Sequence, residues 1–105
     1  MKTMILIPAL APGAELIDYL QALSDAQLGQ LVVVDDGSGP DYAPIFALAA
    51  QIPGCTVLRH EQNRGKGDAL KTGLRYFQEL PDRSEYNGVV TADADGQHSV
   101  ADVTA

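Results

Sequence analysis

The sequence predicts an α/β domain built on a three-layer, Rossmann-like parallel sheet with the strand order 3-2-1-4. Two observations support this prediction. Four short apolar runs alternate with three amphipathic segments along the 105 residues. The apolar runs lack polar alternation, which suits strands that are covered on both faces. Helical connections between such strands imply right-handed crossovers and parallel neighbours.

The expected strands are the four apolar runs, and the expected helices carry apolar side chains at intervals of three and four residues. The strands cover residues 3–8, 31–34, 56–59 and 88–92. The helices cover residues 14–23, a segment marked by Ile45, Leu48, Ala49 and Ile52, and residues 68–80 with Leu70, Leu74 and Phe77 facing inward. Ser38 or Asp41 is expected to cap the second helix.

Composition restricts the class of protein. Hydrophobic residues make up 46% of the chain, enough for a core, and no apolar run approaches the roughly 20 residues of a membrane span. Seven basic and fourteen acidic residues give a net charge of −7. This charge argues against nucleic-acid binding, which depends on Lys and Arg neutralising phosphates. Cys55 is the single cysteine, so no intrachain disulfide forms and a reducing, cytoplasmic setting is expected.

Two carboxylates, Asp93 and Asp95, follow the last apolar run, and the amide of Gln97 comes shortly after them. Acids at this spacing can turn toward one point where the chain leaves a strand. Carboxylate and amide oxygens suit Mg²⁺ or Mn²⁺ carrying a phosphorylated ligand. A polar turn that only ends the strand is the alternative, because Asp and Gly are common turn residues.

Two further polar loops follow predicted strands. Residues 35–38 read Asp-Asp-Gly-Ser and would bind a ribose hydroxyl or a base N–H, or else form a turn or helix cap. Residues 63–68 contain two glycines, Arg64 and Lys66, and would cradle an anion at a helix N-terminus, or else form a solvated loop. Ligands bind at the carboxyl ends of parallel strands, so the convergence of these loops favours a ligand site.

Four motifs together resemble the family 2 glycosyltransferases of the GT-A fold, and within them the dolichol- or polyprenyl-phosphate sugar transferases. The likeness covers nearly the whole chain and lies in the order and spacing of the set. The motifs are Ile7-Pro8-Ala9, Val33-Val34-Asp35-Asp36-Gly37-Ser38, Asn63-Arg64-Gly65-Lys66-Gly67-Asp68-Ala69-Leu70 and Asp93-Ala94-Asp95-Gly96-Gln97-His98.

The resemblance implies the donor-binding portion of an inverting, metal-dependent glycosyltransferase that uses a UDP- or GDP-linked sugar. Asp36 would bind uracil or guanine, and Pro8 and Ala9 would line the base and ribose pocket. Arg64, Lys66 or the backbone of their loop would lie near the nucleotide.

The resemblance also implies a metal site and an acceptor. Asp93 would contact ribose or metal, and Asp95 and Gln97 would hold Mg²⁺ or Mn²⁺ on the diphosphate. The acceptor would be a lipid phosphate or a glycan. One departure is that Leu10-Ala11-Pro12-Gly13 replaces an aromatic-Asn-Glu sequence that the family often carries.

Residues 1–105 are interpreted as the nucleotide-sugar-binding part of a longer enzyme whose general base lies beyond residue 105. The chain by itself is expected to be inactive and to self-associate, and the full-length protein is expected at the cytoplasmic membrane face. Two other classes stay open. One is a non-catalytic nucleotide- or metal-binding module. The other is a phosphotransferase or phosphatase with a D-x-D-G signature, a class that places its acids after the first strand.

Overall fold

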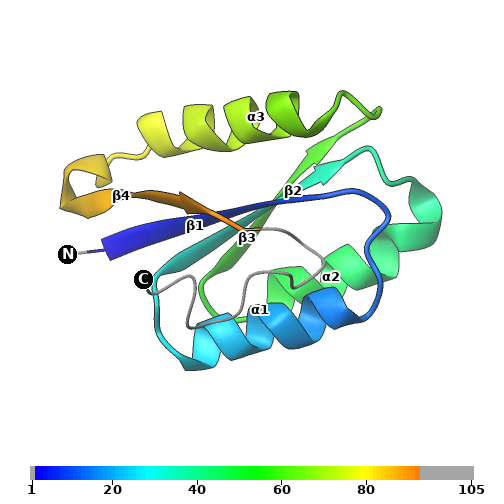
Figure 1. Ribbon diagram of the computed structural model, residues 1–105, viewed down its shortest axis with the longest axis horizontal. Helices are drawn as coiled ribbons and strands as arrows, with labels where there is room; N and C mark the ends of the chain where they lie inside the picture. Colours follow the sequence, from blue (N-terminus) through cyan, green and yellow to red (C-terminus); the bar gives the residue numbers. More distant parts are fainter. Residues whose placement is uncertain (1, 93–105) are drawn as a thin grey trace.

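A four-stranded parallel sheet in the order β3-β2-β1-β4 forms the middle layer of the protein (Figure 1). The computed structural model describes residues 2–92. The strands are β1 (Lys2–Ala9), β2 (Gln30–Asp36), β3 (Cys55–His60) and β4 (Tyr86–Thr91). The predicted fold class and strand order are therefore confirmed, as is the parallel pairing of β1 with β2 and β4 and of β2 with β3.

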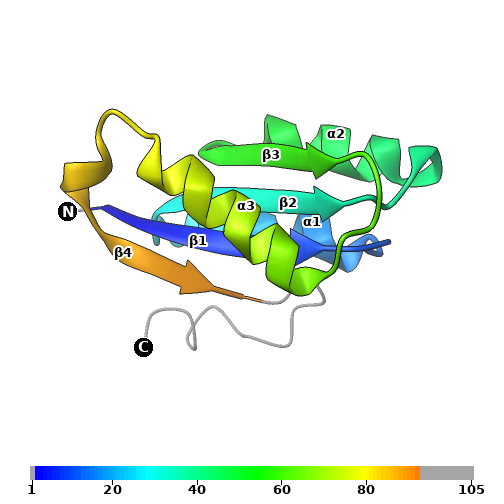
Figure 2. The ribbon, with the colours of Figure 1, turned by 90° about the horizontal axis from the view of Figure 1, so that it is seen from above.

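Helices cover both faces of the sheet. Helices α1 (Glu15–Asp25) and α2 (Ala43–Gln51) lie on one face, and α3 (Lys66–Gln78) lies on the other (Figure 1). Seen from above, α3 crosses the sheet obliquely (Figure 2). Two short 3₁₀ helices, η1 (Pro40–Tyr42) and η2 (Arg83–Glu85), lead into α2 and β4.

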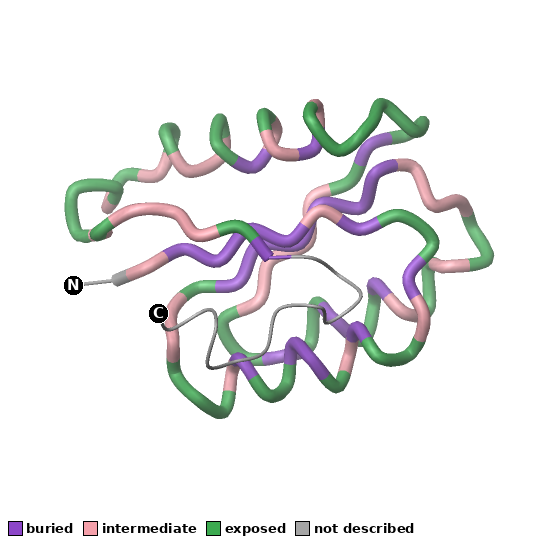
Figure 3. Tube along the Cα trace, in the orientation of Figure 1, coloured by how far each residue is buried: buried purple, intermediate pink, exposed green. Residues whose placement is uncertain are grey.

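The side chains of β1 explain why its sequence is continuously apolar. Ile5 and Ile7 join a core cluster with α1 and α2, whereas Met4 and Leu6 join a second cluster with α3. Successive side chains of a strand point to opposite faces of the sheet, so a strand between two helical layers needs apolar residues at every position. The burial of the central strands and of the inner faces of the helices is visible in Figure 3.

Two leucines of the predicted helices are exposed, Leu74, which was expected to face inward, and Leu48, which helped to mark the second helix. Leu74 is 42% exposed and Leu48 is 52% exposed. On α3 the helix face against the sheet is centred on Ala69 and Gly73, which are buried. A residue next to Gly73 in sequence is rotated by about 100° around the helix, so Leu74 turns away from the sheet. On α2 the buried positions are Phe46 and Ala49.

The predicted cap of α2 is also wrong. Tyr42 occupies the N-cap position of α2, and no side chain caps this helix. The Ser38 hydroxyl accepts a hydrogen bond from the Ala11 amide instead, and Asp41 lies within η1, before the start of α2. Pro44 stands in the first turn of α2, where a missing amide proton costs no helical hydrogen bond.

Candidate functional site

A cavity of about 370 Å³ opens at the carboxyl ends of the strands. One wall is the β1–α1 connection, residues 8–13 together with Glu15, and the other is formed by Asn63, Gly65 and Lys66 before and at the start of α3. Asp36 at the end of β2 also lines the cavity. The strand register brings these parts together, because Ala9 lies opposite Asp35 and Asp36 lies opposite His60.

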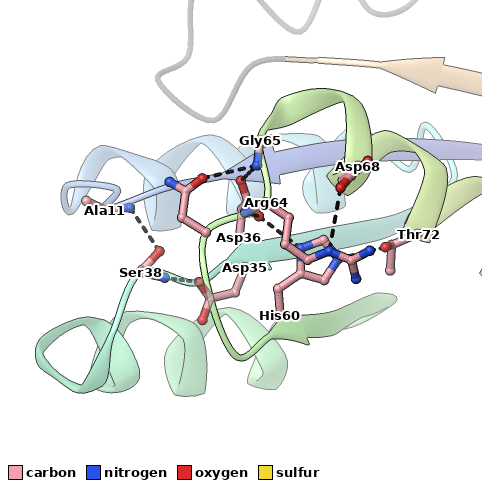
Figure 4. A network of polar contacts seen from close by, with 10 residues as sticks. Ala11, Asp35, Asp36, Ser38, His60, Arg64, Gly65, Asp68 and Thr72 are labelled. Carbon is pink, nitrogen blue, oxygen red and sulfur yellow. Dashed lines mark hydrogen bonds and ion pairs between the residues drawn. The ribbon is translucent and has the colours of Figure 1, made fainter.

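The Asp36 carboxylate is buried and holds the loop that precedes α3. Asp36 as a whole is only 3% exposed. Oδ1 accepts a hydrogen bond from the Arg64 amide at 2.9 Å and lies 2.9 Å from His60 Nδ1. Oδ2 accepts a hydrogen bond from the Gly65 amide at 2.9 Å (Figure 4). These contacts fix the loop that forms one wall of the cavity.

The same contacts keep Asp36 ionised. Burial alone would raise the pKa of the carboxyl, but the hydrogen bonds from His60 and from the amides of Arg64 and Gly65 outweigh burial and hold its pKa below the ordinary value of 3.8. A hydrogen bond to a carboxylate stabilises the charged form. The cavity therefore contains a fixed negative charge whose oxygens act only as hydrogen-bond acceptors.

The neighbouring acid, Asp35, holds the other wall. Asp35 Oδ1 accepts a hydrogen bond from the Ser38 amide at 2.9 Å. The Ser38 hydroxyl in turn accepts a hydrogen bond from the Ala11 amide at 2.9 Å (Figure 4). Two adjacent acids at the end of β2 thus order the two opposite walls of one cavity.

Gly37 lets two loops approach at backbone distance. Its φ of 73° lies in the left-handed region, and a Cβ atom placed on Gly37 would overlap the backbone of Gln62 and Asn63. Only glycine satisfies both conditions without strain. The Asp-Asp-Gly-Ser sequence is therefore needed in part for packing between loops.

The two basic residues predicted near the ligand lie in different places. Lys66 lines the cavity. The Arg64 side chain instead lines an adjacent hollow with residues 59–62, and its Nε lies 3.5 Å from Asp68 Oδ2 in an exposed ion pair. Arg64 contributes to the wall of the cavity through its backbone amide.

The cavity and its loops at the carboxyl ends of the strands agree with the result of a comparison with known protein families. The sequence profile of Glycosyl transferase family 2 matches residues 5–104. The chain belongs to this family. Family 2 membership accounts for the parallel sheet in the order 3-2-1-4, which is the N-terminal part of a GT-A fold.

Two curated relatives match nearly the whole of this family 2 chain. An uncharacterized protein of Methanocaldococcus jannaschii is 34% identical over 99 residues, which is 94% of this chain and 37% of the relative. A UDP-N-acetylglucosamine–dolichyl-phosphate N-acetylglucosaminyltransferase of Methanococcus voltae is 28% identical over 112 residues, covering 94% of this chain and 43% of the relative. The chain therefore spans about two-fifths of the length of these relatives.

The metal residues predicted for this family 2 chain lie outside the described residues. These are Asp93, Asp95 and Gln97. Within residues 2–92, no group of three or more His, Cys, Asp or Glu side chains is placed to hold a metal ion. In the same part of the chain, no helix combines the length and the apolar character needed to cross a bilayer. Of the predicted nucleotide-binding residues, the cavity brings together Pro8, Ala9, Asp36 and Lys66.

Sequence reasoning assigned no role to His60, although its side chain contacts Asp36. The signal that could have revealed it was positional. His60 ends β3 as Asp36 ends β2, and the two strands are parallel neighbours in register. Glu15 was also missed as a lining residue, because its position in the first turn of α1 was judged only by helix periodicity.

Proposed function

We propose that this chain forms the donor-binding part of an inverting, metal-dependent glycosyltransferase that takes a UDP-linked sugar. Family 2 membership supports the transferase class. The observation that carries the proposal is the position of the ionised Asp36 carboxylate at the wall of a cavity of about 370 Å³, a size suited to a small-molecule ligand.

The hydrogen bonds of Asp36 favour uracil over guanine. Each carboxylate oxygen has two lone pairs. Oδ1 uses both, toward His60 and Arg64, whereas within the described residues Oδ2 accepts only the amide of Gly65. One acceptor position is therefore left. Uracil offers a single N–H on its pairing edge, whereas guanine offers two adjacent donors that would need both oxygens of the carboxylate.

The rest of the cavity supplies surfaces for the base, the ribose and the diphosphate of the nucleotide. Pro8 and Ala9 offer apolar surface for the base and the ribose, as proposed from the family resemblance. Lys66 begins α3 and lines the cavity. The amides at a helix N-terminus attract anions, so the diphosphate would lie toward Lys66.

Asp93, Asp95 and Gln97 would hold Mg²⁺ or Mn²⁺ beside the diphosphate. Their carboxylate and amide oxygens are the donor types that such hard cations prefer, and Asp93 would alternatively contact the ribose. A bound divalent ion would stabilise the negative charge that develops on the leaving nucleoside diphosphate.

The acceptor is proposed to be a lipid phosphate. The Methanococcus voltae relative is named as a dolichyl-phosphate N-acetylglucosaminyltransferase, which supports this proposal. A glycan acceptor is the alternative. Inverting transfer needs a general base within hydrogen-bond reach of the acceptor, and that base is proposed to lie in the part of the enzyme that this chain does not span. The chain alone would then bind donor without transferring sugar, and the longer enzyme would act at the cytoplasmic face of a membrane.

Calorimetric titration of the chain with UDP, GDP and UDP-N-acetylglucosamine, with and without Mn²⁺, tests the proposal. UDP is expected to bind more tightly than GDP, and to bind more tightly with Mn²⁺ than without it. Asp36→Ala should weaken binding of the nucleoside even without metal, and Asp95→Ala should remove the metal dependence.

A control for these variants is Asp25→Ala at the end of α1, where the carboxylate bonds only Gln21 in the described structure. It should bind UDP as the parent does. If Asp36→Ala and Asp95→Ala also bind as the parent does, the assignment of the site is wrong. Tighter binding of GDP would refute the preference for uridine.

A further inference from the structure

His60 is a buried histidine whose two ring nitrogens both have partners. The residue is 6% exposed. Nδ1 lies 2.9 Å from Asp36 Oδ1, and Nε2 lies 2.6 Å from the hydroxyl oxygen of Thr72 in α3 (Figure 4). Because both nitrogens are engaged, the imidazole ring has one orientation. His60 therefore joins the ends of β2 and β3 to the middle of α3.

The chemistry of Asp36 determines which ring nitrogen carries the proton. An ionised carboxylate only accepts hydrogen bonds, so the contact of 2.9 Å requires Nδ1–H to donate to Asp36. Nε2 of the neutral ring is then an acceptor, and the Thr72 hydroxyl donates to it. A hydroxyl can rotate to donate or accept, so Thr72 serves either form of the ring.

The carboxylate that His60 holds is the one that holds the cavity wall. The Asp36 oxygens accept the amides of Arg64 and Gly65. Gly65 is the N-cap of α3 and has a φ of 94°, a conformation that glycine adopts readily. Without the hydrogen bond from His60, only the two loop amides would orient the carboxylate, whose terminal torsion is broad. The carboxylate and the loop would then be able to shift together.

We propose that His60 is a positioning residue of the nucleotide site: its Nδ1–H orients the Asp36 carboxylate, which in turn fixes the Arg64–Gly65 wall of the cavity and leaves one acceptor position for the base. This inference rests on the proposed nucleotide-binding function. It assigns His60 no contact with the ligand itself.

Two substitutions separate the donor function of His60 from its bulk. His60→Asn places an amide N–H near the position of Nδ1 and can still donate to Asp36. His60→Gln places its amide near the position of Nε2, so it reaches toward Thr72 and leaves Asp36 without this donor. His60→Asn is expected to keep UDP affinity within about threefold of the parent, whereas His60→Gln and His60→Ala should weaken it about tenfold or more, the usual effect of losing a hydrogen bond to a charged group.

Val57→Ala is the matched control for lost stability. Val57 lies in the same strand, is half-buried, and packs on the opposite face of the sheet. This variant should lower the free energy of unfolding but leave UDP affinity unchanged. A purely structural role for His60 predicts the contrary, namely that affinity follows stability in all four variants.

Nuclear magnetic resonance provides a readout that does not need ligand. The ¹⁵N spectrum of the parent should show His60 with its proton on Nδ1. The amide signals of Arg64 and Gly65 should move upfield in His60→Gln and stay in place in His60→Asn and Val57→Ala. If His60→Ala does not fold, Thr72→Val tests the same network from its other end and should shift the His60 signals.

The outcomes separate this inference from the proposed function. Failure of the parent to bind UDP would refute the proposed function, and the amide signals would still test whether His60 orients Asp36. UDP binding by His60→Gln at parent affinity, with the Arg64 and Gly65 signals unchanged, would overturn the positioning role. A proton on Nε2 alone would overturn it as well.

Discussion

The Ser38 hydroxyl accepts a hydrogen bond from the Ala11 amide at 2.9 Å across 27 positions of the sequence. This contact ties the β1–α1 connection to the end of β2. Asp35 orders Ser38 on one side, and Asp36 orders Arg64 and Gly65 on the other. Each wall of the cavity therefore depends on a different acid of one short motif, and the two walls can be perturbed separately.

Ser38→Ala tests the first wall. Loss of the hydroxyl removes the acceptor of the Ala11 amide and should lower the free energy of unfolding by about 1 kcal/mol. UDP affinity should fall as well, because residues 8–13 line the cavity. Urea denaturation and calorimetric titration measure the two effects.

Ser24→Ala is the control for that variant, because the Ser24 hydroxyl donates to the Pro53 carbonyl away from the cavity. It should lose similar stability and keep UDP affinity. Equal affinity for UDP in both serine variants would show that Ser38 has no influence on the site.

Asp36→Asn tests the charge of the buried carboxylate. The pKa of Asp36 is lowered in the folded protein, so ionisation stabilises the fold at pH values above the ordinary 3.8 of the unfolded chain. This contribution is lost as the pH falls through the lower, folded-state pKa. The nitrogen of the asparagine amide donates and cannot accept a hydrogen bond, so one of the two backbone amides loses its acceptor. The free energy of unfolding of the variant should fall by about 1–3 kcal/mol at pH 7.

The difference in the free energy of unfolding between Asp36→Asn and the parent should therefore be largest near neutral pH. It should become smaller below pH 3.8. Urea denaturation of both proteins across this pH range measures it. A difference that stays constant down to the lowest pH at which the parent folds would contradict a stabilising ionised Asp36.

Gly37→Ala and Gly39→Ala separate backbone strain from steric overlap. Both glycines have positive φ, 73° and 94°, but a Cβ on Gly39 meets no atom within 4 Å, whereas one on Gly37 overlaps the backbone of Gln62 and Asn63. Gly39→Ala should cost about 1–3 kcal/mol from strain alone. Gly37→Ala should cost more and should also weaken UDP binding by displacing the loop before α3. Thermal denaturation measures both variants. An identical loss of stability in the two would exclude the close contact between Gly37 and the backbone of Gln62 and Asn63.

Cys55 should react slowly in the folded protein. Burial raises the pKa of its thiol to about 11, so almost no thiolate is present at neutral pH, and the thiolate is the reactive form. Alkylation with iodoacetamide at pH 7.5, a pH on the order of one unit below a free thiol's pKa, is expected to be much slower than in urea. Mass spectrometry follows the reaction cleanly, since the chain has one cysteine. Comparable rates in both states would mean that the thiol is not shielded.

The sequence predicted the sheet because one physical pattern determines it. A strand such as β1, with Met4 and Leu6 on one face and Ile5 and Ile7 on the other, needs helices on both sides, and this requirement is visible in the residues alone. Helix faces were less predictable. Leu74 fits the spacing of Leu70, yet Gly73 takes the position nearest the sheet, and glycine carries no hydrophobic signal.

The candidate site was predicted in its location but not in its internal contacts. That Asp36 and Lys66 would approach each other follows from parallel strands that end at one edge. That Asp36 binds backbone amides of Arg64 and Gly65 depends on the path of a loop, which periodicity does not describe. His60 was missed for a related reason, because its partner lies in another strand and becomes a neighbour only through the register of β2 and β3.

The close contact between α3 at Gly73 and the Leu6 side chain of β1 has a consequence for protein engineering. A Cβ placed on Gly73 would overlap the side chain of Leu6, so α3 rests on β1 with nothing between them. The same helix begins at Lys66 beside the cavity. The direction of the first turn of α3 therefore depends on how the helix packs against β1. A mutant library confined to cavity-lining positions would leave out Leu6 and Gly73, two remote positions at which substitutions would move Lys66 relative to the cavity.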